Sequence, residues 1–272
     1  ITMLTDLIIN IFKVTAIQLA GVFGIFFVFG FVLNELQKWT QTNYRRAFGW
    51  AGILFTAWFG TPIHELGHVF FAAVFRHRID HISLFEPNET TGGLGHVEHS
   101  YNKNCLYQKI GNFFVGSAPM IFGGVILAIM LYFLVPNGKE AITPLLQAAS
   151  PTSYLEAIKT MFLTLFSANN LSNWPFWVFL YLSFCAVSHL SPSEQDRRGM
   201  WQWLGWIVFI LLSVNMILVL MQFDATNYIL KASFHWLNIF VGIFIFAICI
   251  AIVHFLLSLL LRFITFYRFH HF

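Results

Sequence analysis

Charged residues are scarce in this chain of 272 residues. Asp, Glu, Lys and Arg together make up 10% of it, against about 25% in a typical soluble domain. Hydrophobic residues make up 58%, and the mean hydropathy is +0.71. A soluble protein of this length could not bury so much apolar surface, so lipid must cover part of it. The formal net charge of +3 is small and scattered, and gives no case for a nucleic-acid partner.

Cysteine is scarce as well. Cys105, Cys185 and Cys249 lie far apart and have no CxxC spacing. We interpret them as free thiols in apolar or loop positions, because neither a disulfide framework nor a cysteine metal site has this pattern. The chain also lacks an internal repeat and a low-complexity stretch. We therefore expect a single integral-membrane domain over residues 1–272.

Long apolar runs are what the chain has instead. A helix needs about 20 apolar residues to cross a bilayer. Six candidate spans satisfy or approach this length: residues 14–33, 49–75, 110–134, 175–189, 203–223 and 237–261. The fourth is short and polar at its end, so we expect it to enter the protein interior. The sequence predicts an all-α polytopic membrane protein of about six transmembrane helices.

The basic residues indicate an orientation if the spans alternate. One side would then hold nine of them and the other six. The nine are Lys13, Arg76, Arg78, Lys103, Lys109, Arg197, Arg198, Arg262 and Arg268, and the six are Lys38, Arg45, Arg46, Lys139, Lys159 and Lys231. By the positive-inside rule we expect both termini in the cytoplasm, in a bacterial inner (plasma) membrane.

The second span contains the sequence HELGH at residues 64–68. On a helix His64 and His68 project from one face, so two imidazoles can bind one Zn²⁺. Glu65 stands beside them, where it can deprotonate a bound water. Such side chains in an apolar span cost free energy unless they face a cavity or a metal. The alternative is a polar packing cluster that neighbouring hydroxyls satisfy.

A third zinc ligand must come from elsewhere, because a catalytic zinc usually has three protein ligands and one open position. His96 and His99 follow the second span, and His189 and Asp196 follow the fourth. With alternating spans, both segments reach the HELGH motif from the same face of the bilayer. The residues themselves leave these four candidates open.

Residues 78–100 differ from the rest of the chain. Two short runs that favour strands flank the turn-rich sequence Glu86–Gly93. We predict a small β-hairpin insertion directly after the metal-binding helix. The later loop 136–174 is mildly amphipathic over residues 154–166, which indicates an interfacial helix with a linker.

Together these features resemble the site-2 protease class of intramembrane zinc metalloproteases (M50-like). The resemblance rests on HELGH late in one span, the small-residue run Gly116–Gly124 in the next, the Gly92–Gly93 hairpin, and the Pro-x-x-x-Asp stretch that ends at Asp196. It covers about residues 49–199, whereas the helices at 14–33, 203–223 and 237–261 are unmatched. The chain is a divergent member by this comparison, since Asp196 lies one residue nearer to its proline than usual and precedes arginine instead of glycine.

The resemblance implies a function and a site. The function is an intramembrane zinc endopeptidase that hydrolyses a peptide bond in or near a transmembrane segment of a substrate protein. Glu65 would be the general base on zinc-bound water, and Asp196 would join His64 and His68 as the third ligand. His189 stands where the family has asparagine, which implies a supporting or oxyanion-stabilising role.

Two other functions fit the same residues. The family includes inactive relatives, so the altered aspartate segment also suits a catalytically silent zinc-binding scaffold or a subunit of a membrane-protein complex. A zinc transporter is the third hypothesis. It ranks last because such a transporter would have a second set of His, Asn and Asp ligands on the preceding helix, where residues 14–33 offer only Gln18.

Overall fold

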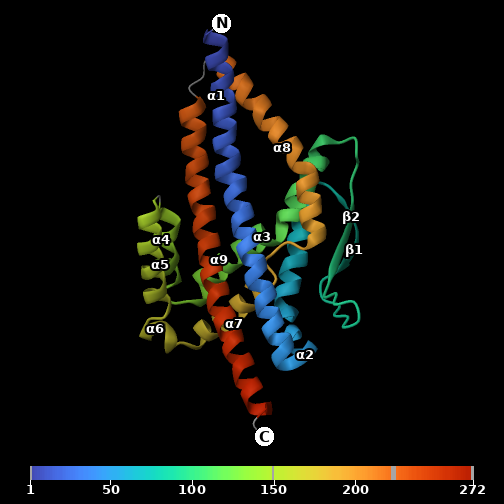
Figure 1. Cartoon of the computed structure of the whole chain (residues 1–272), viewed down its shortest axis with the longest axis vertical. Helices are drawn as coiled ribbons and strands as arrows, with labels where there is room; N and C mark the ends of the chain where they lie inside the picture. The colour runs from blue at the N-terminus through green and yellow to red at the C-terminus, as the bar shows by residue number, and fades with distance from the viewer. Residues whose placement is uncertain (1, 149, 222–224, 271–272) are drawn as a thin grey trace.

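The chain folds almost entirely into helices (Figure 1). The structure is a computed structural model, and it describes residues 2–148, 150–221 and 225–270. Its elements are α1 (Thr2–Gln18), η1 (Leu19–Gly24), α2 (Ile25–Val74), β1 (Arg78–Ser83), β2 (His96–Ser100), α3 (Leu106–Leu134), α4 (Gly138–Gln147), α5 (Pro151–Leu165), α6 (Ala168–Leu171), α7 (Trp174–Val187), α8 (Glu194–Leu220) and α9 (Ala225–His270).

The long helical stretch from α1 to α2 reverses its direction at Gly49. The backbone there has φ 65° and ψ −147°, a non-helical conformation that favours glycine. Figure 1 shows one leg running down from the N-terminus and a second returning beside it. We call residues 2–48 the descending leg and residues 50–74 the returning leg. The returning leg carries HELGH, and the predicted span 49–75 begins at the reversal.

Small residues bring α3 close to the returning leg. A Cβ on Gly67 would lie 3.1 Å from the carbonyl oxygen of Ala118, and a Cβ on Gly123 would lie 3.7 Å from the side chain of Ile63. Such positions let helix backbones approach each other in an apolar setting, where packing rather than the hydrophobic effect holds helices together. α9 runs beside the descending leg and in its direction, with Phe26 stacked on Phe240 and Asn43 bonded to Ser258.

α7 and α8 both run in the direction of the returning leg. Tyr181 of α7 bonds to the carbonyl of Phe55 near the start of the returning leg, and the carbonyl of His189 bonds to His64. α8 then continues upward until Trp206 lies against Lys109 at the start of α3. The pair is therefore one passage interrupted at residues 188–193. The sequence counted it as two spans, 175–189 and 203–223.

This passage changes the predicted topology. The start of α1 and the end of α9 lie at opposite ends of the molecule (Figure 1), whereas six alternating spans would place both termini on one side. The structure does not support six alternating spans, because α7 and α8 do not reverse between them. Arg262 and Arg268 near the end of α9 then change groups, and so does Lys231 near its start. The nine-to-six count becomes eight to seven and no longer supports cytoplasmic termini.

Four helices of the described residues are long and apolar enough to cross a membrane: Ile11–Val74, Leu106–Leu134, Glu194–Leu220 and Leu237–Tyr267. The first includes the reversal, and α7 is a shorter apolar helix of 14 residues. Large apolar side chains such as Phe31, Phe133 and Phe209 are exposed. These features fit a helical membrane protein, but the predicted number of six spans is not confirmed.

The predicted hairpin is confirmed. β1 and β2 pair antiparallel with an irregularity between Ile79 and His81, and Asn88 bridges Gly93 in the turn. The hairpin stands beside the returning leg, since a Cβ on Gly95 would lie 3.0 Å from Thr61. On the opposite side of the molecule (Figure 1), the loop 136–174 forms α4, α5 and α6, of which only a helix at 154–166 was predicted.

Candidate metal centre

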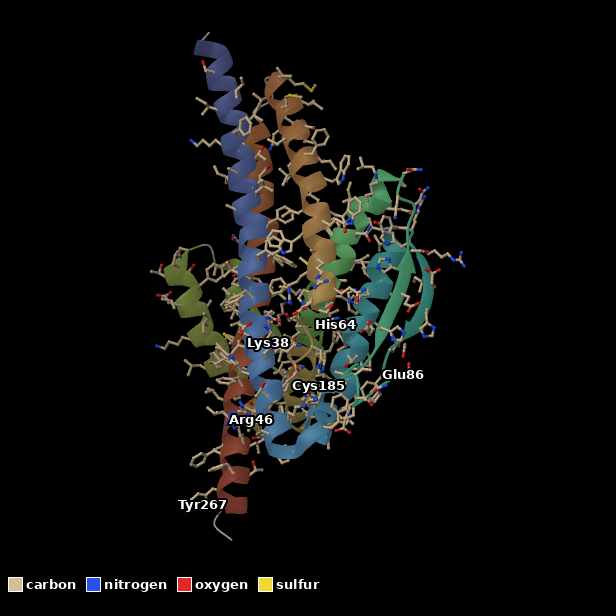
Figure 2. The ribbon with its side chains drawn as sticks, turned by 45° about the vertical axis from the view of Figure 1, so that its right-hand side comes forward. Lys38, Arg46, His64, Glu86, Cys185 and Tyr267 are labelled. Atoms are coloured by element: carbon tan, nitrogen blue, oxygen red, sulfur yellow. The ribbon has the colours of Figure 1, made fainter. Side chains whose placement is uncertain are left out.

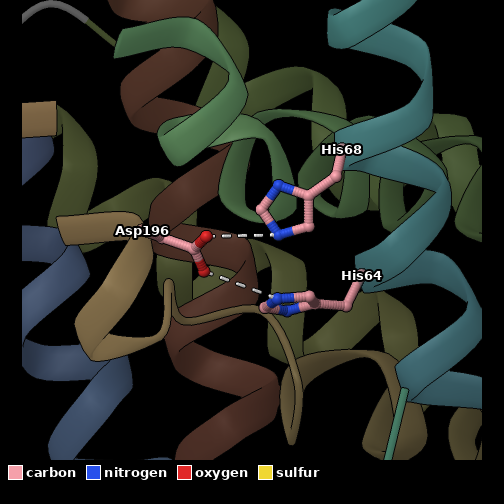
Figure 3. A group of neighbouring side chains, drawn as sticks. All are labelled: His64, His68 and Asp196. Carbon is pink, nitrogen blue, oxygen red and sulfur yellow. Dashed lines mark ion pairs between the residues drawn. The ribbon is translucent and has the colours of Figure 1, made fainter. Parts of the chain in front are cut away.

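His64, His68 and Asp196 meet in space from two distant parts of the chain (Figure 3). The Nε2 atom of His64 lies 3.7 Å from Asp196 Oδ2, and that of His68 lies 3.5 Å from Oδ1. One ligand atom from each residue lies within 4.8 Å of the other two. Among the described residues these three form a group that could hold a metal ion.

Backbone carbonyls orient both imidazoles. His64 Nδ1–H donates to the carbonyl of His189 at 2.7 Å, and His68 Nδ1–H donates to that of Val115 at 2.9 Å. Each ring is thereby fixed in the tautomer that leaves a lone pair on Nε2, directed at the carboxylate. This arrangement is the usual support for a metal-binding histidine.

The sequence explains why these two carbonyls are free. Val115 lies four residues before Pro119, which has no N–H to return to it within α3. His189 lies beyond the end of α7, in the interrupted segment 188–193. A Cβ on Gly60 would clash with the carbonyl oxygen of Cys185 and the ring of His189, so glycine allows this segment to reach the returning leg.

Non-helical backbone inside an apolar protein needs internal partners for its polar groups. At the interrupted segment the descending leg and α8 supply them. Gln41 donates to the carbonyl of Ser188, and Gln37 accepts from the N–H of Ser191. Arg197 donates to the carbonyl of Pro192 at 2.7 Å. Arg197 is partly buried at the start of α8.

Asp196 is held at the first turn of α8. The N–H of Ser193 donates to Asp196 Oδ2 at 2.7 Å, and Ser193 Oγ accepts from the N–H of Asp196 in return. This capping box fixes the carboxylate at a helix N-terminus, where negative charge is stabilised. A Cβ on Gly116 would lie 2.6 Å from the carbonyl oxygen of Asp196, so glycine lets α8 approach α3.

A cavity of about 510 Å³ opens beside the three ligand candidates. Glu65 is buried and lines it together with His64 and His68. Further walls come from residues 95–99 of the hairpin and from the start of α8. α3 also lines the cavity, through Asn112, Val115 and Gly116. The HELGH glutamate and the three ligand candidates thus share one cavity with the hairpin.

The other three predicted candidates lie nearby but outside the ligand group. His96 and His99 line the cavity, and His99 Nδ1 lies 3.2 Å from Nδ1 of His77. The ring of His189 is buried and bonds to the carbonyl of Cys185 at 3.3 Å. Among the described residues that line the cavity His189 has no place, and it contributes its backbone carbonyl instead.

Sequence reasoning missed two residues of the site. Val115 acts through its carbonyl, and the signal for it was the proline four positions later. Asn112 lines the cavity with 8% of its surface exposed. No spacing rule connected it to HELGH, because α3 brings it there by antiparallel packing.

Compared with protein-family models, curated proteins and solved structures, the chain shows no match in any of the three. Function is therefore inferred from the geometry of the ligand group and its cavity.

Proposed function

We propose that the protein is an intramembrane zinc endopeptidase, similar to the site-2 protease class, that cleaves a peptide bond in or near a transmembrane segment of another protein. One observation carries the proposal. His64, His68 and Asp196 converge within apolar helices, and the same cavity contains the buried carboxyl of Glu65.

Zinc suits the donor set. Two imidazole nitrogens and one carboxylate oxygen are the ligands of many hydrolytic zinc sites, with a fourth position left for water or substrate. The two Nδ1–H bonds to backbone carbonyls are the support that such ligands need. When bound, Zn²⁺ would polarise a carbonyl and lower the pKa of a water.

Glu65 is the general base of the proposed reaction. It follows His64 directly on the returning leg and lines the same cavity, so its carboxylate can take a proton from the attacking water. The same carboxyl can pass that proton to the leaving amine. An uncharged isostere at this position would keep the fold and lose the proton transfer.

The hairpin supplies a way to hold the substrate. A helical substrate must unwind before its carbonyl is accessible, and an extended segment can add to the edge of a strand. Residues 96–99 of β2 line the cavity. A strand added beside the hairpin would lie next to the metal ligands.

Comparison of the wild type with Glu65→Gln tests the function, on candidate membrane substrates in detergent or liposomes. We expect the wild type to cleave and the variant to lose activity while it keeps its zinc. Equal cleavage by both proteins would contradict the proposal. A wild type that holds zinc and cleaves no substrate would instead support a silent zinc-binding scaffold.

A further inference from the structure

Peptide hydrolysis places negative charge on one oxygen. When water adds to a carbonyl carbon, the π pair of the C=O bond moves onto its oxygen, and the water proton goes to a base. Hydrogen-bond donors aimed at that oxygen are among the largest contributions to such catalysis. The cavity beside HELGH should therefore contain a donor other than the metal ligands.

Asn112 is on the correct face of α3. It lies three and four residues before Val115 and Gly116, and residues at these spacings share one face of a helix. The carbonyl of Val115 holds His68, and Gly116 lies against Asp196. Because α3 runs antiparallel to the returning leg, Asn112 faces the cavity about one turn beyond His68.

The amide of Asn112 is buried and poorly engaged. Its Nδ2 atom has one long contact, 3.5 Å, to the carbonyl of Gln108 in its own helix. A side-chain amide carries two N–H donors, so at least one remains for a ligand in the cavity. The other N–H can donate to a group that enters the cavity, because Asn112 is one of the residues that line it.

His99 also lines the cavity, but its hydrogen bonds exclude it as a donor to the substrate carbonyl. His77 Nε2–H donates to the carbonyl of Gln108, which leaves Nδ1 of neutral His77 as an acceptor. His99 Nδ1 must then donate to it, and Nε2 of neutral His99 carries a lone pair. The other polar groups of the cavity wall, such as Gln195 and Ser193, are exposed.

We propose that Asn112 donates from Nδ2 to the carbonyl oxygen of the scissile peptide bond and stabilises the charge that develops there. The inference rests on the proposed protease function. In the first step the water oxygen bonds to the carbonyl carbon, its proton passes to Glu65, and the π pair becomes charge on the oxygen beside Asn112. In the second step that pair re-forms the C=O bond, the C–N bond breaks, and Glu65 returns the proton to the amine nitrogen.

The test compares the wild type, Asn112→Ala and Asn112→Leu in detergent. Leucine keeps the size of the side chain and removes the amide. Asn137→Ala is the control, because Asn137 lies before α4 and makes no side-chain cap bond. The first readout is the cleavage of casein as a generic unfolded substrate. The second is the dissociation constant of a phosphinic tripeptide, whose anionic oxygen stands where the substrate develops charge. Zinc content checks the fold of each variant.

We expect both Asn112 variants to lose about 100-fold in kcat and to bind the phosphinic peptide correspondingly less tightly, with KM and zinc content unchanged. The Asn137 variant should match the wild type. If either Asn112 variant keeps its zinc, its kcat and its phosphinate affinity, the assignment of Asn112 is overturned while the protease function stands. If the zinc-loaded wild type neither cleaves nor binds the phosphinic peptide, the function and the inference fall together.

Discussion

At the scale of single residues, the candidate site depends on two carbonyl groups as much as on the three side chains that could bind a metal. Pro119 frees the carbonyl of Val115, and that carbonyl fixes the ring of His68. Pro119 is not itself one of the three ligand candidates. It acts by leaving out one backbone hydrogen bond.

Pro119→Ala should therefore weaken zinc binding. The alanine N–H would compete for the Val115 carbonyl and loosen His68, and loss of such a support typically costs 10- to 100-fold in metal affinity. Pro144→Ala in α4 is the matched control, since it restores a helical N–H far from the site. His64→Ala and Asp196→Ala should abolish tight binding. Competition with a fluorescent zinc chelator measures the zinc affinity of all four variants. An unchanged affinity in Pro119→Ala would contradict the view that the Val115 carbonyl holds His68 for zinc binding.

At the scale of elements, the hairpin is joined to the helices by a pair of neutral imidazoles. His77 follows the returning leg, His99 belongs to β2, and their rings stack with centroids 5.0 Å apart. Burial lowers the pKa of His77, while its bond to the carbonyl of Gln108 opposes the shift. Burial and the charge of His77 lower the pKa of His99, and Asp196 and Asp80 oppose it.

Acid should thus weaken the attachment of the hairpin. Because both pKa values are lowered, the folded pair binds fewer protons than the unfolded chain, and its stabilisation is complete above the ordinary histidine pKa of about 6.5. It is lost as the pH falls below that value. Amide hydrogen exchange of residues 96–100, corrected for the intrinsic rate, should be faster at about pH 5.5 than at about pH 7.5. His99→Gln should remove most of the difference in exchange rate between the two pH values. Equal protection of the wild type at both pH values would contradict the view that protonation of the His77–His99 pair loosens the hairpin.

At the scale of the whole molecule, the interrupted passage of α7 and α8 decides the topology. The descending leg and α9 run one way, and the returning leg runs the other way together with α7 and α8. Figure 2 shows Arg46 and Tyr267 towards one end of the molecule, with His64 well away from that end. A membrane around these helices would therefore enclose the ligand group.

Lys103 and Arg46 should lie on opposite sides of that membrane. Both are exposed, Lys103 after the hairpin and Arg46 beside the reversal at Gly49. Each is replaced by cysteine in a Cys105→Ser background, and an impermeant maleimide is added to sealed vesicles from one side at a time. We expect the two positions to label from different sides. Labelling of both from the same side would mean that the returning leg does not cross.

The sequence alone determined that long apolar helices dominate the chain, that His64 and His68 are paired as candidate metal ligands, and that a hairpin follows them. These follow from local patterns: apolar length, the four-residue spacing on a helix, and turn residues between short strands. The residues themselves left Asp196 as one of four candidates, and only a family resemblance singled it out, because nothing local joins it to residues more than a hundred positions earlier. Tertiary structure decided that α7 and α8 share one direction, that the carbonyls of Val115 and His189 hold the imidazoles, and that Asn112 faces the cavity. Each of these depends on how distant helices pack against one another, and a periodic pattern along one helix carries no information about its neighbour.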